Sequence, residues 1–118
     1  MRETVNDAHR LQHMLDAIDK ILQRDFDQWQ IDIANDPILA YALVKLIEII
    51  GEATYKLTPE FRQNHPDTNW DAIEGLRHIL VHGYYKIKMP RVLDVVNEDI
   101  PLLRDQVTKY IEELQSPI

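Results

Sequence analysis

The segment Arg77–Tyr84, with the sequence RHILVHGY, carries the most chemistry of any stretch in this 118-residue chain. It holds an arginine, two histidines and a tyrosine, at positions 77, 78, 82 and 84. Histidine titrates near neutral pH and can accept or donate a proton during catalysis. Arginine offers a planar, permanently charged fork that matches a phosphate group. Arg77 and His82 are therefore candidates for chemistry at a phosphodiester.

The charge of this region differs from that of the rest of the chain. The formal net charge is −7, which argues against a passive nucleic-acid binder with a broad basic surface. Residues 75–93 nevertheless contain four cations and no carboxylate. These cations are Arg77, Lys86, Lys88 and Arg91. A basic island on an acidic body favours a confined anionic ligand. Lys86, Lys88 and Arg91 would hold flanking phosphates of such a ligand. The alternative is chance clustering of cations on a solvated face.

Two histidine pairs have the four-residue spacing that can present two imidazoles to one metal: His9 with His13, and His78 with His82. Zinc would need further ligands, and neither pair includes the glutamate of an H-E-x-x-H helix. Cysteine is absent, so thiolate ligands are excluded. We predict no metal and no cofactor, with His9 and His13 as surface residues. For His78, a metal-binding role remains the less favoured alternative.

Apolar residues recur at three- and four-residue steps, which predicts amphipathic helices. The segments expected to be helical are 11–22, 25–35, 38–57, 70–83 and 90–114. Asp25 and Asn69 are suitable caps, Pro37 and Pro90 suit first turns, and Pro101 must interrupt the last helix. Residues 59–67 are expected to form a loop. These features predict one all-α domain over residues 1–118, an up-and-down bundle of four to five helices.

Gly83 is expected to end the fourth helix beside His82, which leaves the imidazole free to turn toward a ligand. In an uninterrupted helix Arg77 and His82 would point roughly 140° apart. The alternative on spacing alone is an ion-paired surface arginine with a capping histidine. The chain has no apolar run of membrane-spanning length and no hydrophobic segment at its start, so we expect a cytoplasmic protein without a membrane partner.

The pattern R-x-x-x-x-H-x-Y, formed by Arg77, His82 and Tyr84, resembles the signature of the HepT toxin group of HEPN ribonucleases. Further elements of that group match along most of the chain. They are IGEA at 50–53, PEFR at 59–62, HP at 65–66, W-x-x-I-x-G-x-R at 70–77 and PLL at 101–103. One position departs from the group's pattern, because His78 stands where an asparagine most often follows the arginine. His78 is therefore either a supporting residue or a second imidazole at the site.

The resemblance implies an HEPN-like homodimer with a shared active site, which acts as a toxin endoribonuclease in a type II toxin–antitoxin system. Its substrate would be RNA, either tRNA or mRNA. Metal-independent cleavage needs a base for the 2′-hydroxyl, an acid for the leaving 5′-oxygen and a cation for the developing charge. One His82 per chain does not provide both proton transfers, whereas a two-fold dimer would place two in one cleft. Glu52, on a mostly apolar helix, could orient Arg77 or His82, or simply be exposed.

The resemblance also implies a control mechanism, in which a minimal nucleotidyltransferase antitoxin attaches AMP to Tyr84. Such a group would add negative charge and bulk where the substrate phosphate binds. Tyr85 is the neighbouring alternative acceptor, and core packing is the alternative role for both tyrosines. A second function remains open, that of a non-catalytic helical module that binds or regulates a nucleotidyltransferase.

Overall fold

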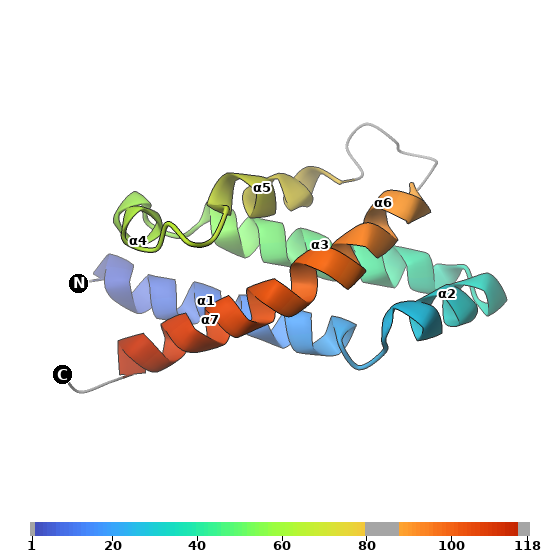
Figure 1. Cartoon of the computed structure of the whole chain (residues 1–118). Helices are drawn as coiled ribbons and strands as arrows, with labels where there is room; N and C mark the ends of the chain where they lie inside the picture. The colour runs from blue at the N-terminus through green and yellow to red at the C-terminus, as the bar shows by residue number, and fades with distance from the viewer. Residues whose placement is uncertain (1, 80–87, 116–118) are drawn as a thin grey trace.

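The structure is a computed structural model that describes residues 2–79 and 88–115, with side chains from residue 7 onward. Every regular element in these ranges is a helix, which confirms the all-α prediction (Figure 1). The elements are α1 (Arg2–Ile21), α2 (Phe26–Asn35), α3 (Ile38–Tyr55), α4 (Pro59–Asn64), α5 (Trp70–Gly75), the 3-10 helix η1 (Leu76–His78), α6 (Met89–Asp94), the π-helix η2 (Val95–Asp99) and α7 (Ile100–Gln115). None of the helices described is both long and apolar enough to cross a bilayer.

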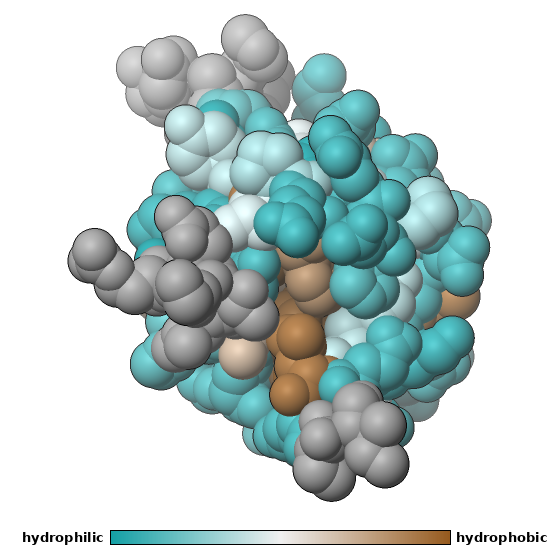
Figure 2. All heavy atoms as spheres, turned by 90° about the vertical axis from the view of Figure 1, so that its left-hand side faces the viewer, coloured by the Kyte–Doolittle hydropathy of each residue, from teal (hydrophilic) through white to brown (hydrophobic). Residues whose placement is uncertain are grey.

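The long helices α1, α3 and α7 form an elongated bundle, in which α1 packs against both others (Figure 1). Helix α5 and η1 lie on α3. Side chains spaced at helical intervals fill the core between the long helices. The largest fully buried ones include Leu11, Met14, Ile18, Leu43, Ile47, Ile50, Ile100, Leu103 and Val107. Seen from the end of the bundle, a narrow strip of hydrophobic residues reaches the surface among hydrophilic ones (Figure 2).

Two helix starts follow the caps predicted from the sequence. The Asp25 side chain accepts a hydrogen bond from the Gln28 backbone N–H at 2.8 Å, and α2 begins at the next residue. The Asn69 side chain accepts one from the Ala72 backbone N–H at 3.2 Å, and α5 begins at Trp70. Each cap satisfies a backbone N–H that has no partner within the first turn of its helix.

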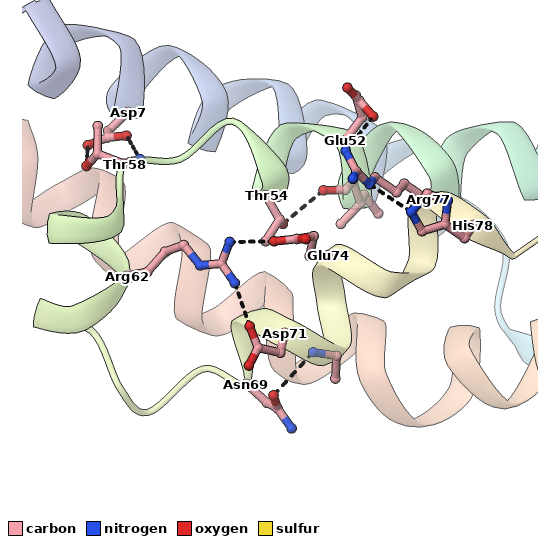
Figure 3. A network of polar contacts seen from close by, with 12 residues as sticks. Asp7, Glu52, Thr54, Thr58, Arg62, Asn69, Asp71, Glu74, Arg77 and His78 are labelled. Carbon is pink, nitrogen blue, oxygen red and sulfur yellow. Dashed lines mark hydrogen bonds and ion pairs between the residues drawn. The ribbon is translucent and has the colours of Figure 1, made fainter.

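The prediction of a loop over residues 59–67 was wrong in its first part, because Pro59–Asn64 forms the short helix α4. The Thr58 hydroxyl accepts a hydrogen bond from the Phe61 backbone N–H, and Pro59 occupies the first turn, where its missing N–H has no consequence. Thr58 is itself held by the buried Asp7 carboxylate, which accepts hydrogen bonds from its backbone N–H at 2.9 Å and its hydroxyl at 2.7 Å (Figure 3).

The predicted fourth helix is shorter than expected. The α-helical segment ends at Gly75, and Leu76–His78 continues as the tighter 3-10 turn η1. Arg77 and His78 therefore do not lie on an α-helix, and the angular estimate that assumed one does not apply. The predicted helix end at Gly83 lies outside the described residues.

The interruption predicted at Pro101 is confirmed. Residues 89–115 follow one helical path, but η2 separates α6 from α7 immediately before the proline. Pro101 is the second residue of α7, and the N–H of Ile100 bonds to the carbonyl of Val95, five residues back. The wider π-turn precedes a residue that has no N–H to offer and whose ring would collide with a regular preceding turn.

Candidate functional site

Gly51 lets η1 come into direct contact with α3. A Cβ atom added to Gly51 would lie 2.4 Å from the backbone nitrogen of Arg77 and 3.0 Å from its Cα. These distances are too short for any side chain, and the obstacle is backbone rather than a flexible side-chain end. Glycine at this position therefore permits the approach that sets the backbone of Arg77 against α3.

Helix α3 supplies two contacts to the Arg77 side chain. The guanidinium carbon lies over the Tyr55 ring, 3.6 Å from its centroid. One terminal nitrogen, Nη1, lies 3.6 Å from Oε2 of Glu52 (Figure 3). Glu52 and Tyr55 are three residues apart, so both lie on the helix face that Arg77 crosses. The guanidinium is thus held by an aromatic face and a partly exposed carboxylate.

His78 makes a third contact with Arg77. The Nε–H of Arg77 donates a hydrogen bond to Nε2 of the exposed His78, at 3.1 Å (Figure 3). In this bond Nε2 acts as the acceptor through its lone pair. Within the described residues, the terminal nitrogens of Arg77 make no hydrogen bond, since the contact with Glu52 is longer than one.

The chain matches the family model named Ribonuclease HepT-like over residues 11–110. It belongs to the HepT-like ribonuclease family. Among its relatives is a protein named as a putative RNase from Caldanaerobacter subterraneus subsp. tengcongensis, 32% identical over 87% of this chain and 92% of the relative. A protein named as a probable ribonuclease HepT from Thermococcus cleftensis is 31% identical over 66% of this chain and 71% of the relative.

A third relative has a longer chain. The protein named as a gamma-glutamylcyclotransferase and putative RNase from Methanocaldococcus jannaschii is 34% identical over 88% of this chain. The match covers 47% of that relative, so the present chain spans about half of its length. No solved structure gives a significant match.

The structure brings together three of the site residues predicted for this HepT-like chain: Arg77, His78 and Glu52. Glu52 is both exposed and paired with Arg77, so the two alternatives raised for it from the sequence coexist. The catalytic, positioning and supporting roles assigned to these residues stay predictions.

The other predicted site residues are less fully located. Lys88 and Arg91 are exposed at the start of α6, and no contact among the described residues joins them to Arg77. His82, Tyr84, Tyr85 and Lys86 lie outside the described residues.

Sequence reasoning missed Tyr55 as a neighbour of Arg77. The only available signal was its position, three residues after Glu52 on a helix already expected to approach the arginine. The His9 and His13 rings lie on the exposed face of α1 with centroids 5.4 Å apart. Over the described part of the chain, no group of three or more potential ligands is arranged to hold a metal ion.

Proposed function

We propose that this HepT-like protein is a metal-independent endoribonuclease and the toxin of a type II toxin–antitoxin pair. The observation that supports the proposal is the state of Arg77, whose guanidinium is fixed against α3 by Tyr55, Glu52 and His78 while its terminal nitrogens make no hydrogen bond to another described residue. A fixed cation of this kind suits a phosphate whose negative charge increases during reaction. Relatives named as RNases support RNA as the substrate class.

In the proposed reaction, the 2′-hydroxyl oxygen of one nucleotide attacks the adjacent phosphorus and the bond to the 5′-oxygen breaks. His82 takes the hydroxyl proton or gives a proton to the leaving oxygen. Arg77 stabilises the charge on the phosphorane oxygens. Lys86, Lys88 and Arg91 hold the flanking phosphates, and the described members of this trio, Lys88 and Arg91, are exposed as that role requires. We propose that this activity takes place in the cytoplasm.

We assign the active site to a homodimer, in which two copies of Arg77 and His82 face one cleft and supply both proton transfers. Hydrophobic side chains that remain exposed on α2 and α3 of the single chain support such an interface: Ile31, Ile38 and Tyr41. Light scattering at micromolar concentration tests this part. A strict monomer of 13.9 kDa would contradict the shared site.

We further propose that a minimal nucleotidyltransferase antitoxin inactivates the enzyme by attaching AMP to Tyr84. The added phosphate would compete with RNA for Arg77 and the nearby lysines. Co-expression should raise the mass by one or more AMP units and abolish cleavage, and Tyr84→Phe should resist inactivation. Modification found on Tyr85 would show that the acceptor is the neighbouring tyrosine, and inactive but unmodified protein would indicate inhibition by binding alone.

Cleavage of a 5′-labelled RNA pool by the purified protein tests the nuclease itself. Arg77→Ala and His82→Ala should each lower the rate by about 10²- to 10⁴-fold. Arg104→Ala is the matched control, because Arg104 is paired with Asp19 at 2.9 Å on an exposed surface and should have almost no effect. Activity should survive EDTA, and loss restored by zinc would instead favour the His78 and His82 metal site.

The His78→Ala variant decides whether His78 assists the reaction, since unchanged cleavage would make it a structural residue. Binding of a nucleotidyltransferase by wild-type protein that cleaves no RNA would favour the second function, that of a non-catalytic module.

A further inference from the structure

Tyr55 has an exposed aromatic surface beside the candidate site. Arg77 lies over its ring, yet 51% of the residue remains accessible to solvent. Tyr55 also borders an open groove between the end of α3 and α4. The other residues that line this groove are Leu57, Pro59, Arg62, Gln63 and Glu74. A half-exposed aromatic ring at the edge of a groove is a common platform for flat ligands.

The groove is not built for a phosphate. Its cation, Arg62, already donates to Glu74 at 2.6 Å and to Asp71 at 2.9 Å (Figure 3). Both terminal nitrogens are therefore engaged by carboxylates, which cancel the positive charge locally. What remains is the Tyr55 ring, apolar surface and the exposed Gln63 amide, which can donate and accept hydrogen bonds. An uncharged, flat, polar-edged ring such as a nucleobase fits this chemistry.

The position of Tyr55 relative to Arg77 determines which nucleotide of the RNA would place its base on the tyrosine ring. Because the guanidinium touches the ring, a phosphate bound to Arg77 brings the sugar and base of the same nucleotide within reach of Tyr55. We propose that Tyr55 stacks with the base of the nucleotide whose phosphate binds Arg77, and that the groove beyond it receives that base. This inference rests on the proposed function and identifies the substrate as RNA that is single-stranded at the cleavage site.

A binding experiment can separate the base from the backbone. Two fluorescent 2′-O-methyl RNA probes, which cannot be cleaved by 2′-oxygen attack, have the same length; one carries all bases and the other is abasic throughout. Tyr55→Ala should weaken binding of the complete probe by about 5- to 150-fold, the equivalent of the ~1–3 kcal/mol that base–aromatic stacking contributes. Binding of the abasic probe should weaken much less, because that probe registers only the loss of the aromatic contact that holds Arg77. Tyr55→Phe keeps this contact and should bind both probes as wild type does.

Two results would overturn the inference. If Tyr55→Ala weakened binding of both probes equally, Tyr55 would act only by positioning Arg77, and if it weakened neither, Tyr55 would have no part in binding. Arg77→Ala serves as the backbone control and should weaken binding of both probes.

Cleavage of unmodified RNA is measured in parallel, so that the two proposals fail separately. If wild type cleaves RNA but Tyr55→Ala does not selectively weaken binding of the complete probe, the base site is refuted and the nuclease is retained. If Tyr55→Ala selectively weakens binding of the complete probe but wild type does not cleave RNA, the base site is retained and the nuclease is refuted.

Discussion

Arg62 and Arg77 lie in neighbouring parts of the same molecule and have similar side-chain exposure, 19% and 21%. Their surroundings differ. Arg62 donates from both terminal nitrogens to carboxylates, those of Glu74 and Asp71 (Figure 3). Arg77 has its nearest described carboxylate at 3.6 Å, and its one described side-chain hydrogen bond goes through Nε to His78. The terminal donors of Arg62 are hydrogen-bonded within the protein, whereas those of Arg77 make no hydrogen bond to another described residue.

Among the described residues, the region around Arg62 is also packed against more helices than the region around Arg77. Next to it, an aromatic cluster joins α4, α5 and α7, and its members are Phe61, His65, Trp70 and Tyr110. The Trp70 indole N–H donates to the His65 carbonyl at 2.8 Å, and the Tyr110 hydroxyl shares a hydrogen bond with Thr68 at 2.7 Å. Arg77 rests instead on the exposed face of α3. The comparison shows that two arginines with similar burial can differ in whether their terminal donors are hydrogen-bonded within the protein, which is the difference expected if Arg62 is structural and Arg77 binds a ligand.

Exchanging each arginine for alanine gives the largest expected difference between the two regions. Arg77→Ala should lower RNA cleavage by about 10²- to 10⁴-fold while leaving the free energy of unfolding nearly unchanged. Arg62→Ala should lower the free energy of unfolding by about 1–3 kcal/mol, because it leaves the partly buried Glu74 without its partner. Urea unfolding and cleavage assays on both variants check this. If both variants lowered the free energy of unfolding equally, the two arginines would not differ in their structural role.

Gly51→Ala tests whether the position of Arg77 depends on close approach to α3. The new Cβ would lie 2.4 Å from the Arg77 backbone nitrogen, so η1 must move away. We expect a loss of about 1–3 kcal/mol in the free energy of unfolding and reduced cleavage, as overpacking typically produces. Thermal unfolding and the cleavage rate are the measurements. Wild-type values for both would show that the contact does not set the site.

Gly75→Ala is the matched control for that variant and should have the opposite sign. Gly75 ends α5 with φ of −61°, and among the described residues a Cβ added there would meet no atom of another element within 4 Å. The substitution should raise the free energy of unfolding by about 0.4–1 kcal/mol, because it reduces the freedom of the unfolded chain without strain in the folded one. Thermal unfolding would again report it, and a destabilised variant would contradict the open space around Gly75.

The smallest expected effect concerns Asp32, which lies outside the site. The Arg24 side chain, which donates to Asp32 at 2.6 Å, and the Gln28 amide together hold the pKa of this carboxyl below its ordinary value of 3.8. The unfolded chain therefore binds the proton more readily. The stabilisation is present above about pH 4 and is lost as the pH falls through the lowered pKa. Asp32→Asn should flatten the acid limb of the stability curve, and an unchanged limb would contradict the assignment.

Several local features of the fold could be predicted from the sequence. Asp25 and Asn69 cap helices where their side chains can reach the next turn, and the interruption at Pro101 follows from its missing N–H. These outcomes depend on residues within one turn of each other, so they can be read from the chain. The family motif likewise identified Arg77. The helix α4 was missed, although Thr58 and Pro59 form a regular helix start, because the prolines nearby were interpreted as a loop.

The tertiary structure alone decided how Arg77 is held. The need for glycine at position 51 arises from the backbone of a different element, and Tyr55 contacts Arg77 only because η1 packs on α3. The sequence likewise contains acidic residues near both Arg62 and Arg77. It does not show which of the two arginines has its terminal nitrogens hydrogen-bonded to carboxylates. Contacts between elements depend on their packing, and packing is a property of the whole fold rather than of any local spacing.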